Sequence, residues 1–136
     1  MRIATIKKNG QEMAAIKTEK GYVSINRING TQDVQFPTDL RILLQSNQFD
    51  ILKIWYDGDG KDILHELPVE KEYTFAPLYR YPNRIWGIGL NYAAHASDLS
   101  EKVPDKYAGS FIKSSTTVLG PVDTIEIPKL SERPTA

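Results

Sequence analysis

The feature that most constrains the fold is the dipeptide Asn9-Gly10, which stands between two short segments with the pattern of β-strands. Asparagine and glycine both tolerate the positive φ angles that a two-residue hairpin turn requires. Residues 2–7 precede this turn and residues 12–17 follow it, and both segments have the length and composition of strands. The sequence therefore predicts an antiparallel hairpin at the start of the chain.

A third strand is expected directly after this hairpin. Residues 19–21, Glu-Lys-Gly, favour a second turn, and the stretch YVSINRI at residues 22–28 follows it. Val23 and Ile25 would share one face of such a strand, because side chains alternate along it. The three strands together predict an antiparallel β-meander.

Two short helices are expected after the meander. The sequence Pro-Thr-Asp at residues 37–39 is typical of a helix start, and the Thr38 hydroxyl can cap free backbone N–H groups. A second helix is predicted for residues 49–56, and the sequence DGDGKD at residues 57–62 ends it. Helical spacing predicts these inward-facing side chains: Leu40, Leu43 and Leu44 in the first helix, and Ile51, Leu52 and Trp55 in the second.

The acidic sequence DGDGKD has part of the pattern of a calcium-binding loop. Asp57 and Asp59 match its first ligands, but Lys61 stands where the third ligand is needed, and the glycine comes too early. A solvated turn is the preferred interpretation. His65 follows within the sequence ILHEL, which predicts an outward-facing residue on a strand.

Residues 68–83 have the composition of a linker, with three prolines and several charges, although a short strand at residues 73–75 is compatible with them. The strand-like sequence RIWGIGL follows, and further short strands are expected around Phe111, Val118 and Ile125. The predicted organisation has three segments: an N-terminal β-rich domain (1–70), a linker (71–83) and the start of a second β-rich domain (84–136).

The predicted fold class is α+β, mostly β, with one or two helices. The chain has 136 residues, a formal net charge of zero and no basic stripe, so neither nucleic acid nor a membrane is an expected partner. It contains no cysteine, which excludes disulfides, thiolate metal sites and a cysteine nucleophile. The N-terminal residues lack a long apolar stretch, so the expected location is the cytoplasm.

The stretch WGIGLNYAAHASD at residues 86–98 allows two interpretations. Its paired glycines are reminiscent of a dinucleotide-binding turn, yet Tyr92 stands where that turn needs a third glycine for close packing of helix on strand. The acidic residue that should follow about 20 positions later is also missing. The sequence therefore disfavours dinucleotide binding.

The second interpretation of this stretch is acid–base chemistry. His95 and Asp98 are three residues apart, which places them on the same face of a helical turn. A carboxylate beside an imidazole favours the protonated ring or fixes the tautomer of the neutral one, and such a pair can accept a proton from water. The alternative is a weak, exposed ion pair on a surface helix, and the spacing alone leaves both open.

The segments RIWGIGLNYAAHASD and FIKSSTTVLGPVDTIEIP, within residues 84–128, resemble the fumarylacetoacetate hydrolase superfamily. The resemblance implies a β-rich catalytic domain that acts on 2-oxo and 2,4-dioxo acids by hydrolysis, decarboxylation, hydration or isomerisation, with Mg²⁺ or Mn²⁺ as cofactor. It implies that His95 is a general base and that Asp98 orients it. Tyr92 and Lys113 would line the substrate pocket, although an exposed strand lysine is the alternative for Lys113.

Two departures from the family pattern bear on activity. The family has glutamate where the shorter Asp98 stands, and Glu101, one turn further on, could substitute for it. The metal-binding Glu-x-Glu pair of the family would follow the final sequence SERPTA, and Asn91 replaces a metal-binding aspartate of one branch. We therefore expect this chain alone to bind no metal and to be an inactive part of an enzyme, which needs a homo-oligomer or a complementary C-terminal segment. The alternative is a non-catalytic assembly or binding module that retains a relic His–Asp segment.

Overall fold

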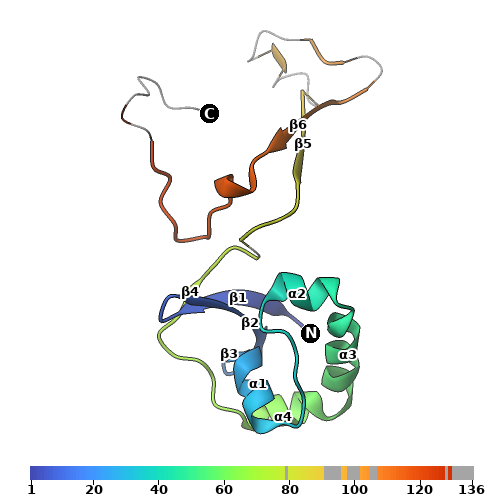
Figure 1. Cartoon of the computed structure of the whole chain (residues 1–136), viewed down its shortest axis with the longest axis vertical. Coiled ribbons are helices and arrows are strands. Elements are labelled where there is room, and N and C mark those ends of the chain that lie inside the picture. The colour runs from blue at the N-terminus through green and yellow to red at the C-terminus, as the bar shows by residue number, and fades with distance from the viewer. Residues whose placement is uncertain (79, 91–95, 98–101, 105–106, 128, 130–136) are drawn as a thin grey trace. The chain divides into compact units, whose positions relative to one another are not determined.

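The structure is a computed structural model that describes residues 1–78, 80–90, 96–97, 102–104, 107–127 and 129 (Figure 1). Its elements combine helices with antiparallel strands, which confirms the predicted α+β class. The chain divides into two compact units: Met1–Tyr79 with Leu119–Ala136, and Arg80–Val118. Each unit is described separately below.

A four-stranded antiparallel sheet forms one layer of the first unit, in the order β3-β2-β1-β4. Asn9 and Gly10 have φ angles of 50° and 79°, which confirms the predicted two-residue turn between β1 and β2. The strand expected within the predicted linker is β4, which pairs with β1 at the edge of this sheet. The strands of the sheet are β1 (Ile3–Lys8), β2 (Gln11–Lys17), β3 (Tyr22–Ser24) and β4 (Thr74–Phe75).

Helix α1 (Ile25–Thr31) begins where the sequence predicts that the third strand continues. Strand β3 ends at Ser24, whose side-chain oxygen accepts a hydrogen bond from the backbone N–H of Arg27 at 3.3 Å. This N-cap satisfies a donor that the first helical turn would leave free, and it outweighs the strand propensity of the neighbouring residues. Ile25 and Ile28 are fully buried on the helical face that packs into the core. The prediction of a strand through Ile25 is therefore wrong.

Helices α2 (Leu40–Gln45) and α3 (Gln48–Trp55) confirm the two predicted helices. The N-cap of α2 is Asp39 and not Thr38, because a side-chain oxygen of Asp39 accepts a hydrogen bond from the backbone N–H of Ile42 at 2.9 Å. The predicted inward-facing residues divide as follows: Leu40, Leu43 and Leu52 are buried and Trp55 is partly buried, whereas Leu44 and Ile51 are 44% and 50% exposed.

The sequence DGDGKD ends the helical run of α3, as predicted, and leads into a further short helix. Gly58, within the segment η1 (Tyr56–Gly60), has the non-helical angles φ −83° and ψ −119°, so the helix breaks there before α4 (Lys61–Glu66) begins. Helix α4 directs Leu64 into the core, where it is 2% exposed, and leaves the next residue, His65, at the surface. The prediction that His65 lies on a strand is therefore wrong, because the packing of Leu64 against distant residues decides the local structure.

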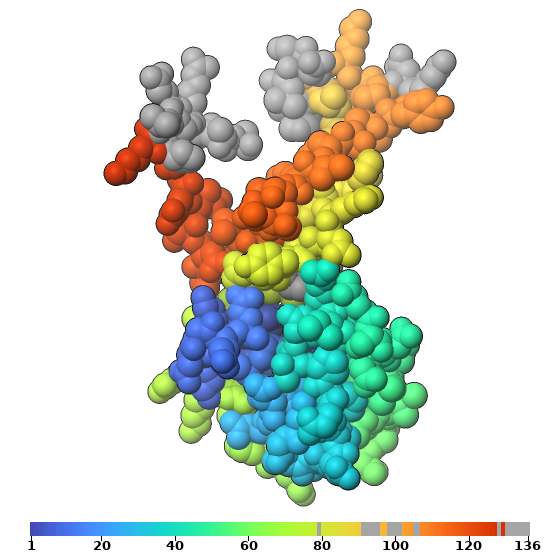
Figure 2. Space-filling model, viewed as in Figure 1, coloured from blue at the N-terminus to red at the C-terminus, as the bar shows by residue number. Residues whose placement is uncertain are grey.

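The core of the first unit lies between the sheet and the helices α1 to α4 (Figure 1). The ring centroids of Phe36 and Trp55 are 6.0 Å apart, so aromatic packing extends the core beneath α3. Figure 2 shows the side chains of this unit, in blue, cyan and green, packed against one another. The buried cluster draws on both layers: Ala14, Ile16 and Val23 from the sheet, and Ile25, Ile28, Leu40, Leu43, Leu52 and Leu64 from the helices.

An antiparallel hairpin of β5 (Ile85–Gly89) and β6 (Gly109–Lys113) forms the sheet of the second unit. These strands confirm the predictions for RIWGIGL and for the region around Phe111. Val118 ends a 3-10 turn, η2 (Ser115–Thr117), and Ile125 lies in irregular chain, so the predictions of strands at these two residues are wrong. No helix in the described part of the chain is long and apolar enough to cross a membrane.

Candidate functional site

One of the four predicted site residues lies in the described part of the chain. Lys113 is the last residue of β6, and its side chain is exposed. The other predicted residues lie outside the described part: Tyr92, His95 and Asp98, together with the related positions Asn91 and Glu101. The catalytic and substrate-binding roles of all these residues therefore stay predictions.

The first glycine of the Gly-x-Gly pattern is required by packing within the hairpin. Gly87 and Phe111 lie directly opposite each other in β5 and β6. A Cβ atom at residue 87 would lie 2.3 Å from Cζ of Phe111, much closer than the roughly 3.5 Å at which two carbon atoms make contact. The ring of Phe111 covers the backbone of Gly87, and such cross-strand aromatic pairing compensates for the missing side chain. This contact explains the glycine without a nucleotide.

Lys113 lies on the same face of β6 as Phe111, two residues away. Its Nζ atom is 5.8 Å from the centroid of the Phe111 ring, which is a cation–π contact at an exposed site. Its partner across the hairpin is Ile85, whereas Gly89 pairs with Gly109 at the other end. Four residue steps separate these two pairs, a distance of about 13 Å along a strand. Lys113 therefore lies at the end of the hairpin remote from the point where the chain continues to the His–Asp segment.

Leu90, directly after β5, has an unusual backbone conformation with a φ angle of 57°. A residue with a Cβ atom in this left-handed region costs roughly 1–2 kcal/mol. Such strained residues cluster at binding and catalytic sites, where the surrounding structure holds them in place. Because Leu90 immediately precedes the stretch with Tyr92 and His95, its strain is the described feature that points most directly to a site there.

The hairpin exposes large apolar side chains and both of its strand edges. Trp86, Ile88 and Ile112 are 62%, 63% and 65% exposed, and Trp86 lies opposite Ile112. Within the described residues, neither β5 nor β6 pairs with a third strand. An isolated two-stranded sheet is marginally stable in water, and free strand edges favour pairing with another chain. This surface is therefore suited to association.

Glu70 is a buried carboxylate of the first unit that the sequence does not single out. Its Oε1 atom accepts hydrogen bonds from Ser24 Oγ at 2.7 Å and Arg27 Nε at 3.1 Å, and its Oε2 atom accepts one from Lys8 Nζ at 2.8 Å. Burial raises the pKa of this carboxyl, but the hydrogen bonds from Lys8, Ser24 and Arg27 and the charge of Arg27 lower it to about 2. Since donors occupy both oxygens, Glu70 joins β1, β3 and α1 and has a structural role.

The described residues do not fit the divalent-ion site that the family resemblance implies. Among them, no three histidine, aspartate or glutamate side chains come together in a group that could hold a metal ion. Within DGDGKD, Asp57 Oδ1 lies 3.7 Å from Lys61 Nζ, so this aspartate takes part in an ion pair across one helical turn.

Comparison with known proteins gives similarity to one protein of Archaeoglobus fulgidus, which is described as uncharacterized. The two sequences are 32% identical over 99 residues, which is 73% of this chain and 36% of the relative. The chain therefore spans about a third of the length of this curated relative. No protein-family model and no solved structure matches the chain.

Proposed function

We propose that this chain is the N-terminal part of a metal-dependent enzyme of the fumarylacetoacetate hydrolase superfamily that acts on 2-oxo or 2,4-dioxo acids. The observation that supports the proposal is the pairing of β5 with β6. The sequences Gly-x-Gly and Phe-x-Lys, which carry part of the resemblance, lie on these two strands, and the ring of Phe111 leaves no room for a side chain at Gly87. The two sequences are therefore linked by a direct packing contact between paired strands and belong to one structural feature.

In this proposal, His95 accepts a proton from a water molecule, and Asp98 orients the imidazole and favours its protonated form. Tyr92 and Lys113 line the pocket in this proposal, although Lys113 lies at the hairpin end remote from the point where the chain continues to His95. When bound, Mg²⁺ or Mn²⁺ would polarise the oxo group of the substrate. The ion's carboxylate ligands would come from outside the described residues or from another polypeptide, so we assign no step to it here.

We further propose that the isolated chain is inactive and that its hairpin pairs with strands of a complementary C-terminal segment or of a second copy. The exposed side chains of Trp86, Ile88 and Ile112 support this proposal, since a partner strand and its side chains would cover them. The match covers only 36% of the archaeal relative, so the rest of that protein can be tested as a candidate partner. The proposed location is the cytoplasm, consistent with the absence of cysteine from the sequence.

The test is an assay with a 2,4-dioxo acid, whose consumption is followed by the loss of its enol absorbance. The purified chain is measured with Mn²⁺ alone and with a separately produced polypeptide that covers the part of the archaeal relative outside the match. We expect turnover only in the mixture, and we expect His95→Ala to abolish it. Ser97→Ala, two residues away on an exposed helical position, is the matched control and should keep the activity.

Two results would contradict this proposal. Metal-dependent turnover by the chain alone would show that it is not an incomplete part of an enzyme. A stable complex of the two polypeptides that consumes no oxo acid would favour the second candidate function, a non-catalytic assembly or binding module. The feature that favours this second function is the exposed apolar surface of the hairpin, since association requires only such a surface and no catalytic residue.

A further inference from the structure

The strands of the first unit place only basic charges on the face of the sheet opposite the helices. Side chains alternate along a strand, so Arg2 and Lys8 share this face of β1, whereas Ile3 packs against the core on the other face. Lys17 lies beside Arg2, because its backbone N–H donates a hydrogen bond to the Arg2 carbonyl at 2.9 Å. Glu12 is the one acidic residue in strands β1 to β4, and its register places it on the helix-covered face.

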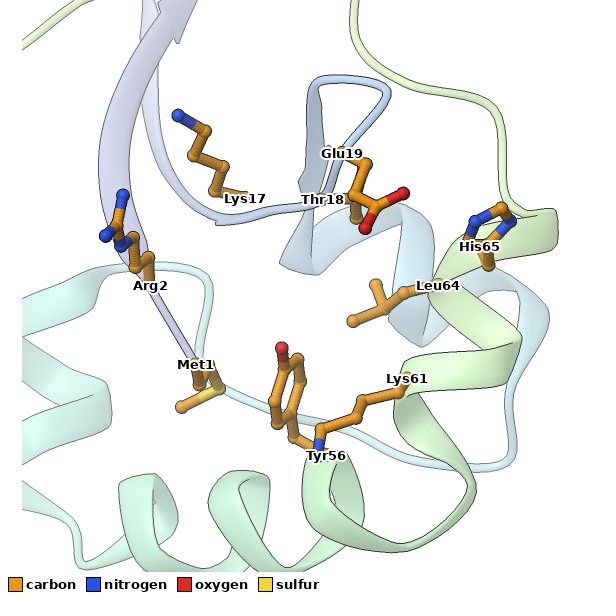
Figure 3. A pocket seen from close by; sticks show the side chains of 9 residues that line it. All are labelled: Met1, Arg2, Lys17, Thr18, Glu19, Tyr56, Lys61, Leu64 and His65. Carbon is orange, nitrogen blue, oxygen red and sulfur yellow. The ribbon is translucent and has the colours of Figure 1, made fainter.

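Arg2 and Lys17 form a first pair of cations on this face. Figure 3 shows the charged ends of both side chains directed away from Tyr56 and Leu64, which belong to the helical side of the unit. Both residues are exposed, and in the described part of the chain no ion pair joins either of them to an acidic residue. Their N–H donors are therefore available to the oxygens of a carboxylate.

Lys8 and Arg27 form a second pair of cations on the same face. Buried Glu70 holds both of them, through Lys8 Nζ at 2.8 Å and Arg27 Nε at 3.1 Å. One carboxylate balances one of the two positive charges, and each cation retains further N–H donors. The two side chains border a hollow of about 320 Å³ that Met13 and Ser24 also line. Glu70 therefore fixes the positions of two cations that keep a net positive charge.

Three aromatic rings cover the apolar residues of this face. Tyr22 lies opposite Lys17, and Phe75 lies opposite Ile6, which is fully buried although it is outside the core cluster. The ring centroids of Tyr22, Tyr73 and Phe75 are 5.3 to 5.9 Å apart, and the rings pack edge to face. Nucleic-acid bases stack on exposed ring faces, but only Phe75 of the three is exposed, at 40%. The rings therefore suit apolar side chains better than bases.

We propose that this face binds an extended acidic segment of a partner protein. One acidic side chain binds to Arg2 and Lys17, another binds to Lys8 and Arg27, and apolar side chains between them lie against the aromatic rings. The complementary charges select the partner and set its orientation. Arg2 and Lys8 are six residues apart on one strand, about 20 Å, so acidic residues at a similar spacing fit both pairs. All these residues belong to the first unit, so the proposal does not depend on the proposed catalytic function.

The test follows the fluorescence anisotropy of a labelled heptapeptide with glutamate at both ends and alternating serine and valine between them. In an extended conformation, this peptide places its glutamates and valines on one face. We expect saturable binding to the full chain. Arg2→Gln with Lys17→Gln should weaken binding by roughly tenfold or more, because charge-assisted hydrogen bonds are lost. Lys7→Gln with Lys53→Gln removes the same charge from exposed positions on the helical side, so this matched control should leave the affinity unchanged.

Two further probes separate an acidic protein segment from other partners. The same peptide with glutamine at both ends should not bind, and a short oligothymidylate should not displace the acidic peptide. The proposal is overturned if the acidic peptide gives no saturable change, if the neutral peptide binds equally well, or if the charge-matched control weakens binding as much as the double variant. Displacement by oligothymidylate at equal concentration would also overturn it, since the face would then be a nucleic-acid site. If the double variant does not fold, the neutral peptide decides.

Discussion

Replacement of Glu70 by glutamine tests the most specific electrostatic interaction of the first unit. The Glu70 side chain is 5% exposed and lies 2.8 Å from Lys8 Nζ and 3.1 Å from Arg27 Nε. Glutamine has nearly the same shape, so Glu70→Gln removes the negative charge without leaving a cavity. The two cations then face a neutral amide that can no longer accept all of their hydrogen bonds.

The magnitude follows from the pKa of Glu70, which is lowered from 4.5 to about 2 in the folded chain. A carboxyl with a lowered pKa stabilises the fold above its unfolded pKa, and this effect is lost as the pH falls from about 4.5 to about 2. The shift corresponds to at most about 3 kcal/mol. Because the side chains of Lys8 and Arg27 are 30% and 33% exposed, solvent screens the pairs, and we expect Glu70→Gln to lower the free energy of unfolding by about 2 kcal/mol at pH 7.

The assay is urea unfolding followed by the fluorescence of Trp55, which packs against Phe36 in the first unit. A Trp86→Phe background removes the other tryptophan of the chain. The difference between Glu70→Gln and its parent should fall to less than half of its pH 7 value at pH 3, because Glu70 is by then protonated in the unfolded chain. Glu66→Gln, at an exposed position of α4, is the control and should change stability by less than about 0.5 kcal/mol. Equal stability of Glu70→Gln and its parent at pH 7, or a difference that stays constant down to pH 3, would refute the reasoning.

Three further substitutions test local features. Gly87→Ala places a Cβ 2.3 Å from Phe111 Cζ, so it should abolish most of the hydrogen-exchange protection that the pairing of β5 with β6 provides. Addition of Phe111→Ala should restore part of this protection, and unchanged protection in Gly87→Ala alone would contradict the contact. Gly10→Ala places a side chain on a residue with a φ of 79°, so it should lower the free energy of unfolding in urea by about 1 kcal/mol. An unchanged free energy of unfolding would contradict the hairpin turn. Asp39→Ala removes the cap of α2 and should cost about 1 kcal/mol in the same assay, whereas Asp39→Asn should retain most of the stability.

The parts of the fold that the sequence predicts correctly are those decided by local chemistry. The turn at Asn9-Gly10 is an example, since both residues take the positive φ angles that their side chains allow. The prediction of a strand through Ile25 is wrong because the local sequence is ambiguous. Ser24 can cap a helix, but the residues around it also alternate as in a strand. In the structure, burial of Ile25 and Ile28 on one helical face decides between them.

The features that the sequence does not reveal depend on contacts between distant residues. The partners of Glu70, Lys8 and Arg27, are 62 and 43 residues away from it along the chain. Glu70 lies among the charged residues of the segment 68–83, and the composition of this segment does not distinguish a buried carboxylate from the exposed charges of a linker. For the predicted site, the pairing of His95 with Asp98 rests on their spacing in the sequence. The structure adds the contact that explains why Gly87 and Phe111 occur together.

The two units differ in how completely they bury their apolar side chains. The core cluster of the first unit is closed by residues of that unit, whereas the hairpin leaves Trp86 62% exposed. A partner that adds a strand to β5 or β6 would move the Trp86 indole into a less polar environment and shift its emission to shorter wavelength. It would not change the environment of Trp55, which packs against Phe36 within its own core. Trp86 therefore reports on strand addition, and a partner that altered only Trp55 would argue against strand addition at the hairpin.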